Sequence, residues 1–188
     1  TSEHGNIFDF VMKIQNLKFG EAVKHLAQLA GMQPYMFSKQ DEEREKKWKE
    51  YQSIFSQYVD FYHNELLKNE SYSVARDYLK NRSLTKEEVK KFKIGYIQKN
   101  PNFYEKLKDN YSEQTLAETG LFYLDEKKKT YVERFRGRLI FPINNISGQP
   151  IALGGRIIEN LEYLAKYINS PETNFFRKGS NLYNLDLA

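Results

Sequence analysis

The sequence predicts an α+β fold in which amino-terminal helices are followed by a small, largely antiparallel sheet with a basic groove. Apolar residues recur at helical spacing through most of the chain, and the period changes from 3.6 to 2 in the last third. The excess positive charge lies in residues 134–179, which have seven basic and three acidic residues, whereas residues 1–133 have 22 and 21. The charge and the strand-like period therefore coincide in one part of the chain.

Composition limits the kinds of site that the chain can hold. It has 188 residues, no cysteine and three histidines far apart in the sequence, which excludes disulfides and Cys-ligated metals. No run of about 18 apolar residues occurs, so we expect no membrane span. There is no carboxylate pair, Walker-type loop or nucleophile beside a base. The basic block therefore predicts a binding surface for an anionic partner rather than a reaction centre.

Two short helices are predicted in residues 5–31. Asn6 can cap the first helix, because its side chain accepts hydrogen bonds from the first-turn amides. The second helix covers residues 19–30, and Gly31 ends it as the residue after the C-cap. Two helices of this size bury little surface by themselves. We expect residues 32–40 to form a linker.

The strongest helical pattern covers residues 41–68. Its apolar positions are mostly aromatic and recur at helical spacing: Trp48, Tyr51, Ile54, Phe55, Tyr58, Val59, Tyr62 and Leu66. Such a stripe could stack nucleic-acid bases, but a stripe that faces the core is the better prediction.

Shorter helices are expected between this helix and residue 120. They cover residues 73–80, residues 86–92, a segment that begins at Pro101, and residues 112–119. Thr85 and Glu88 form a capping box, Pro101 suits the first position of a helix, and Gly120 closes the last helix. A polar turn is predicted at residues 125–129.

Strands are predicted in the last third, at residues 131–135, 138–143 and 150–153, with turn-forming residues between the second and the third. Because side chains alternate along a strand, Arg134, Arg136 and Arg138 are expected on one face, roughly 6.5 Å apart. Three like charges repel unless an anion lies across them, and a phosphate backbone is such a partner. The alternative is a solvated strand whose arginines pair with scattered glutamates.

Gly154 and Gly155 follow the third predicted strand. Glycine permits close approach of the backbone, either to a neighbouring strand or to a ligand. The sequence leaves both possibilities open.

Four motifs together carry a resemblance to a family. They are RFRGRLIFPI at 134–143, ALGGR at 152–156, KYINSPET at 166–173 and FFRKGSNLY at 175–183. In this order and at these separations they resemble bacterial DnaG-type DNA primases. Residues 5–31 resemble the end of the family's zinc-binding domain, and residues 75–96 its segment after the first long helix.

The resemblance implies the amino-terminal half of an RNA polymerase core. Residues 1–31 would be the carboxy-terminal helices of the zinc-binding domain, 32–40 a linker, and 41–188 the amino-terminal part of the core. The full-length parent would be a DNA primase, a nucleotidyltransferase that synthesises short RNA primers on single-stranded DNA. It would use zinc in the upstream domain and Mg²⁺ or Mn²⁺ in the downstream TOPRIM domain. This piece alone is expected to be inactive, with no catalytic residue, metal site or cofactor of its own.

The resemblance also assigns roles to individual residues. Those expected to bind nucleic acid are Arg82, Arg134, Arg136, Arg156, Lys166 and Lys178; Arg134 and Arg136 would lie near the active-site cleft. A loop with Lys166, Tyr167 and Asn169 is expected to bind nucleotide. The family usually has Gly where this chain has Ser83, so the loop that presents Arg82 could differ if that position needs positive φ.

The expected partners are a single-stranded DNA template and NTPs and, through the full-length parent, the replicative helicase and single-strand-binding protein, at a replication fork in the bacterial cytoplasm. One alternative is a non-catalytic single-stranded DNA-binding or helicase-associated module derived from a primase. Another is an interaction domain whose arginines pair with an acidic protein.

Overall fold

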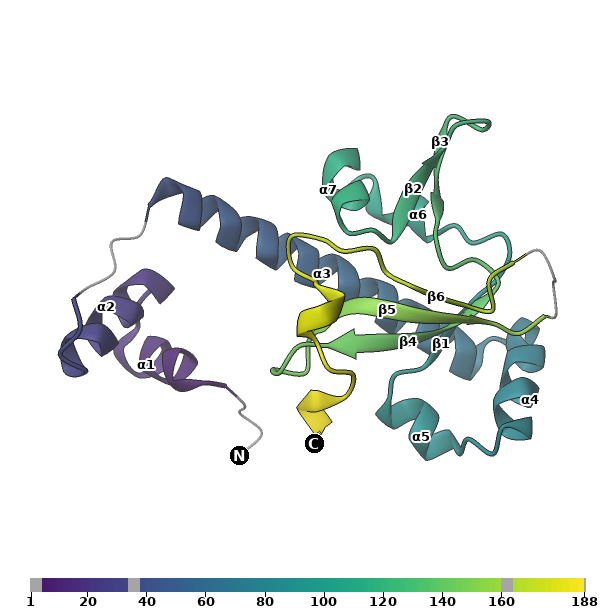
Figure 1. The fold of residues 1–188 in the computed structure, drawn as a ribbon, viewed down its shortest axis with the longest axis horizontal. Coiled ribbons are helices and arrows are strands. Elements are labelled where there is room, and N and C mark those ends of the chain that lie inside the picture. Colours follow the sequence, from purple (N-terminus) through teal and green to yellow (C-terminus); the bar gives the residue numbers. More distant parts are fainter. Residues whose placement is uncertain (1–4, 34–37, 160–163, 188) are drawn as a thin grey trace. The chain divides into compact units, whose positions relative to one another are not determined.

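The structure is a computed structural model that describes residues 5–33, 38–159 and 164–187. The chain divides into two compact units, Thr1–Lys46 and Lys47–Ala188 (Figure 1). The second unit contains both sheets and all the residues expected to bind nucleic acid or nucleotide.

The first unit contains α1 (Ile7–Gln15) and α2 (Phe19–Leu29). The Asn6 side chain accepts hydrogen bonds from the Phe8 and Asp9 amides, and the Asp9 carboxylate accepts one from the Asn6 amide. This confirms the predicted cap. Gly31 follows α2 with φ of +66°, as predicted.

The long helix α3 (Lys39–Lys68) begins two residues before its predicted start. Ser38 and Asp41 cap it reciprocally: each side chain accepts a hydrogen bond from the other residue's amide. Part of the expected linker, residues 34–37, lies outside the described residues. The aromatic stripe faces the core as predicted, because every stripe residue from Tyr51 to Leu66 is at most 4% exposed.

The second unit contains one four-stranded and one two-stranded antiparallel sheet. The first has the order β1 (Gly95–Ile97), β4 (Arg138–Asn144), β5 (Pro150–Ile157), β6 (Tyr167–Asn169). The second pairs β2 (Phe122–Asp125) with β3 (Thr130–Glu133). The predicted β4–β5 hairpin and the α+β class are confirmed. β1, β2 and β6 were not predicted, and β5 extends four residues beyond the predicted third strand.

Short helices lie between α3 and β2 in the sequence: η1 (Glu70–Tyr72), α4 (Ser73–Asn81), α5 (Lys86–Lys91), α6 (Phe103–Leu107) and α7 (Glu113–Glu118). Further short helices follow β6: η2 (Lys178–Ser180) and η3 (Leu185–Leu187). The predicted capping box at Thr85 and Glu88 is present. The expectation for Pro101 is wrong, because α6 begins at Phe103 with Asn102 as its N-cap.

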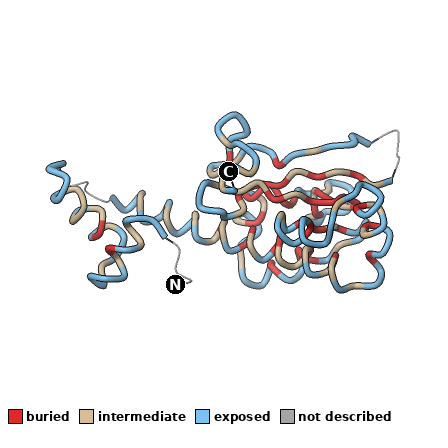
Figure 2. Tube along the Cα trace, turned by 90° about the horizontal axis from the view of Figure 1, so that it is seen from below, coloured by how far each residue is buried: buried red, intermediate tan, exposed pale blue. Residues whose placement is uncertain are grey.

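The core of the second unit forms two clusters of buried side chains. The larger one joins α3, α6 and α7 to both sheets, and the smaller one lies around α4, α5 and β4. Figure 2 shows buried positions concentrated in this sheet-bearing unit. In the first unit, the buried described residues are Val11 and Ala22.

The prediction that three arginines share one strand face is wrong. Arg134 and Arg136 lie in a turn between β3 and β4, where Gly137 has φ of +70°. Arg138 begins β4 and is only 5% exposed. Between the two arginines of the turn, the ring of Phe135 inserts into the core, where it is fully buried.

Candidate nucleic-acid interface

Arg156 lies at the centre of a cluster of cations and rings from three separate segments. It pairs across strands with Tyr167, whose hydroxyl accepts a hydrogen bond from Arg156 Nη1 at 2.7 Å. The Arg156 guanidinium carbon lies 5.2 Å from the ring centroid of Tyr167 and 5.3 Å from that of Tyr78 on α4. Arg82 lies 5.6 Å from the same Tyr78 centroid. The fold thus brings together Arg82, Arg156 and Tyr167, although 85 positions separate Arg82 from Tyr167 in the sequence. We call these residues and Tyr78 the Arg156 cluster.

Arg82 is presented by the carboxy-terminal turn of α4. The Leu84 amide donates to the Leu79 carbonyl and the Ser83 amide to the Lys80 carbonyl, the pattern of a Schellman motif. Ser83 has φ of +60°, so this position does require the left-handed region, where glycine is normally preferred.

Lys166 precedes β6 and has an exposed side chain, while its carbonyl is held by the sheet. That carbonyl accepts hydrogen bonds from the Ile157 amide at 3.0 Å and from Arg138 Nη1 at 3.3 Å. Burial lowers the pKa of Arg138, but a guanidinium remains charged at neutral pH. Arg138 therefore supports the backbone of the KYINSPET motif rather than facing solvent. The expected loop of Lys166, Tyr167 and Asn169 is corrected, because Tyr167–Asn169 is strand β6.

Asn169 and Lys178 line one hollow of about 300 Å³. Its other lining residues come from β4, β5 and the last segment of the chain: Phe141, Ile143, Gly154, Phe176, Asn181 and Tyr183. A Cβ at Gly154 would lie 3.4 Å from Asn169 Oδ1, so the missing side chain keeps this wall open. The hollow combines aromatic surface, amides and one ammonium group, which suits a nucleobase and a nearby phosphate.

Gly155 serves the opposite purpose to Gly154. A Cβ there would lie 2.5 Å from Phe135 Cδ1. Gly155 therefore allows a core ring to approach, which is neither of the two possibilities that the sequence left open, and Gly154 borders the hollow.

Arg134 and Arg136 form a separate group around Tyr123 of β2. Arg134 Nε donates to the Gly120 carbonyl at 2.8 Å, and Arg136 Nη2 donates to the Tyr123 hydroxyl at 2.8 Å. Both guanidinium carbons lie within 5.8 Å of the Tyr123 ring centroid. Five of the six expected basic residues are therefore distributed over the Arg156 cluster, the hollow and this Tyr123 group, and Lys166 lies outside all three, directly before β6.

The segment that links β6 to Lys178 is fixed by buried hydrogen bonds. Ser170 exchanges two bonds with Leu153, one through its amide and one through its hydroxyl. Thr173 Oγ1 accepts hydrogen bonds from the Phe175 and Phe176 amides and lies 3.1 Å from the Tyr51 hydroxyl.

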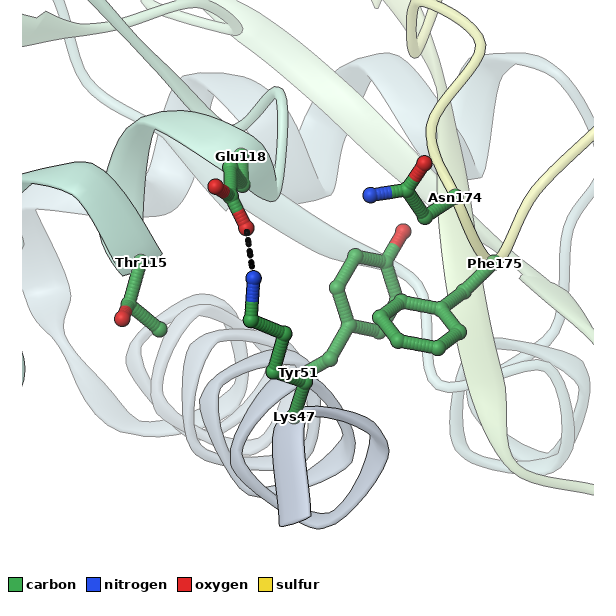
Figure 3. Close-up of a pocket in the computed structure, with 6 residues that line it drawn as sticks. All are labelled: Lys47, Tyr51, Thr115, Glu118, Asn174 and Phe175. Carbon is green, nitrogen blue, oxygen red and sulfur yellow. Dashed lines mark ion pairs between the residues drawn. The ribbon is translucent and has the colours of Figure 1, made fainter. Parts of the chain in front are cut away.

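Tyr51 joins this segment to α3, beside a small pocket between α3, α7 and Phe175 (Figure 3). Its hydroxyl donates to the Ile151 carbonyl at 2.7 Å, and burial raises its pKa to about 12. Lys47 and Glu118 pair at 3.9 Å at the pocket edge. The NSPET and FFRKG motifs thus hold the wall of the hollow in place.

Glu133 is a buried residue that the sequence analysis did not single out. Its Oε2 accepts hydrogen bonds from the Tyr58 and Tyr62 hydroxyls at 2.9 and 2.6 Å, and its Oε1 from the Phe103 amide at 2.8 Å. Burial raises the pKa of Glu133, and these hydrogen bonds oppose that shift. The signal available in the sequence was an acidic residue inside an aromatic, strand-like run, directly before the RFR motif.

The described residues contain no group of three or more His, Asp or Glu side chains placed to hold a metal ion. In the same part of the chain, no helix has the length and apolar character needed to cross a bilayer.

Comparison with known proteins shows that this arrangement is similar to one part of DNA primases. Residues 61–188 match the family model for the amino-terminal domain of the DNA primase catalytic core. DNA primase of Buchnera aphidicola subsp. Baizongia pistaciae is 36% identical over 192 residues, and DNA primase of Geobacillus stearothermophilus is 35% identical over 190. These alignments cover 97% and 98% of this chain and 31% of each relative.

Solved structures agree with this match. The DnaG primase catalytic domain bound to ssDNA is 32% identical with a TM-score of 0.64, over 75% of this chain and 43% of that one. The zinc-binding and RNA polymerase domains of Aquifex aeolicus primase are 29% identical with a TM-score of 0.64, and the alignment covers 97% of this chain and 42% of that one. The chain belongs to the DNA primase catalytic core, amino-terminal domain family. It spans about a third of the length of the curated relatives described.

Proposed function

We propose that this chain supplies template-strand binding and part of the nucleotide-binding surface to a DNA primase that synthesises short RNA primers on single-stranded DNA. The observation that carries the proposal is the convergence of Arg82, Arg156 and Tyr167 from three segments. A relative of similar fold binds ssDNA. Cations interleaved with rings suit a single strand, because phosphates meet guanidinium groups and bases stack on aromatic faces.

The proposed roles of the residues follow from the chemistry of their side chains. Arg82, Arg134, Arg136, Arg156, Lys166 and Lys178 contribute positive charge to phosphates of the template. Tyr167 and Asn169 contribute a stacking face and a planar donor–acceptor group to a nucleotide, together with the charge of Lys166. Asn169 and Lys178 line the same hollow, which supports neighbouring positions for nucleotide and template.

Residues 1–31 would be the end of a zinc-binding domain, 32–40 a linker and 41–188 the first part of the polymerase core. The metals of primer synthesis, zinc and Mg²⁺ or Mn²⁺, would be held outside this chain, and its own residues take the roles of binding and orientation. The helicase and single-strand-binding protein would be met by the full-length parent.

A salt series with labelled single-stranded DNA tests the proposal. Binding should be weak, nearly independent of sequence, and steeply reduced by salt. Each lost phosphate contact lowers the slope of log K against log salt by about 0.7, so the Arg134→Ala, Arg136→Ala, Arg156→Ala triple variant should lose about 2. Fluorescence anisotropy measures both affinity and slope.

The matched control removes three lysines from α3: Lys46→Ala, Lys47→Ala and Lys49→Ala. It makes the same charge change outside the three proposed contact groups, so most of the affinity and the slope should remain. Equal losses in the two triple variants, or a flat salt response in the unaltered chain, would contradict a specific template track.

A further inference from the structure

Tyr78 lies within the Arg156 cluster, although no motif of the chain assigns it a role. We infer that Tyr78 is a positioning residue for the template: its ring holds the guanidinium groups of Arg82 and Arg156 in place for the phosphates of a single strand. This inference rests on the proposed function and adds to it a residue that need not touch the DNA.

The ring of Tyr78 is the contact that Arg82 and Arg156 share. Tyr78 lies in the last turns of α4, and its centroid is 5.6 Å from the guanidinium carbon of Arg82 and 5.3 Å from that of Arg156. The ring itself is fixed, because it is half-buried against the core cluster around Leu79 and Val89. A rigid aromatic face thus connects a helix end to the β5–β6 edge of the sheet.

Among the described residues, tyrosine rings hold Arg156, and no carboxylate does. In the described part of the chain it makes no ion pair, and its Nε is buried without a hydrogen-bond partner. Its contacts are the Tyr167 hydroxyl and the two tyrosine rings. Its positive charge is therefore oriented but not neutralised by any described carboxylate, which leaves it available to an incoming anion.

Two guanidinium groups on one ring repel each other in the free protein. A phosphate that lies across both would remove this repulsion and accept charge-assisted hydrogen bonds from each. A flexible arginine loses side-chain entropy when it binds, and a ring that already restricts the guanidinium lowers that cost. Tyr78 should therefore increase DNA affinity through Arg82 and Arg156.

The test is a double-mutant cycle on the 188-residue chain with single-stranded DNA. Tyr78→Leu should weaken binding about tenfold, because both cation–ring contacts are lost. Tyr78→Phe keeps the ring and should bind like the unaltered chain. When Arg82 and Arg156 are both replaced by Ala, adding Tyr78→Leu should cause little further loss, because the residues through which Tyr78 acts are already gone.

Phe92→Leu is the matched control. Phe92 packs against the same core cluster and carries a lysine, Lys91, 5.5 Å from its ring centroid, but it is outside the Arg156 cluster. This variant should lose a similar amount of stability and keep its DNA affinity. Melting curves of all variants identify any failure to fold, and Tyr167→Phe, which removes only the hydroxyl that holds Arg156, gives a second and milder perturbation with a predicted loss of affinity.

The outcomes separate the inference from the proposed function. If the Arg82 and Arg156 double variant binds DNA as tightly as the unaltered chain, the template track itself is wrong. If that variant binds weakly but Tyr78→Leu has no effect, or its effect adds fully to that of the arginines, the track stands and the positioning role is overturned. Weak DNA binding by Tyr78→Phe, which keeps the ring, would also overturn the positioning role.

Discussion

Glu133 stabilises the fold through three hydrogen bonds that only the folded chain can assemble. Its partners Tyr58 and Tyr62 on α3 and Phe103 on α6 lie 75, 71 and 30 positions away in the sequence. Burial and the charge of Glu133 raise the pKa of Tyr58 and of Tyr62, so both phenols stay protonated as donors. The hydrogen bonds of its carboxyl group thereby hold Glu133 in place directly before the turn that contains Arg134.

Glu133→Gln should lower the free energy of unfolding, because both oxygens of the carboxyl group can accept hydrogen bonds, whereas the amide nitrogen of Gln only donates. We expect a loss of about 1–3 kcal/mol from an unsatisfied buried donor. The pKa of Glu133 is raised above 4.5 in the folded chain, so its stabilising contribution is fully present below pH 4.5 and is lost as the pH rises through the folded pKa. Gln does not titrate, and the difference between the two proteins should therefore shrink toward neutral pH.

Urea unfolding at a series of pH values measures this difference. Glu126→Gln, at the exposed tip of the β2–β3 hairpin, is the control and should change stability by less than about 0.5 kcal/mol. A difference between Glu133→Gln and the unaltered chain that grows from acid to neutral pH would contradict the raised pKa.

The β4–β5 hairpin presents its two glycines to different surroundings. Gly155→Ala should destabilise the chain by about 1–3 kcal/mol, because the buried Phe135 ring must move to admit a methyl group. In Gly154→Ala the new methyl group meets Asn169 Oδ1 at 3.4 Å and the Phe141 carbonyl oxygen at 3.9 Å, and stability should change by less than about 0.5 kcal/mol. Thermal unfolding followed by circular dichroism compares the pair, and equal losses would show that the Phe135 contact does not decide the difference.

Helix boundaries were predictable where the signal is local. The caps at Asn6, Thr85 and Gly31 involve residues a few positions apart, and all three occur in the structure. β1 and β6 have three residues each, too few for a period of 2 to be recognised, and each exists because a longer strand pairs with it.

The candidate site was predictable only in part. The motifs indicated which cations matter, but the turn at Arg134 and Arg136 depends on Phe135 packing over Gly155, 20 positions away. The contacts of Tyr78 with two arginines likewise depend on tertiary structure, and the helical pattern alone marks Tyr78 as an ordinary partly buried aromatic.

The two compact units differ in how much hydrophobic core each contains. Every member of the two core clusters lies at or after Trp48, whereas Val11 and Ala22 are the buried described residues of the first unit. A pair of short helices with so little buried surface is marginal in water. The chain is therefore expected to owe its cooperative unfolding to residues 47–188.

Deletion of residues 1–38 should leave a protein that unfolds in one cooperative transition, with a melting temperature within a few degrees of the whole chain. A peptide of residues 1–33 should show no cooperative transition. Calorimetry and circular dichroism of both pieces, beside the intact chain, check this. Loss of the transition in the shortened protein would mean that the second unit requires the first.

Trp48 gives the chain a built-in optical probe. It is the only tryptophan, and its ring lies 6.1 Å from that of Tyr51 and 5.1 Å from that of Phe175, measured between centroids. Its emission therefore reports one place, where α3 meets the segment that leads to Lys178. Detachment of this segment and global melting can both be followed there without any dye, and the detachment gives a local signal that far-ultraviolet ellipticity, an average over the whole backbone, does not resolve.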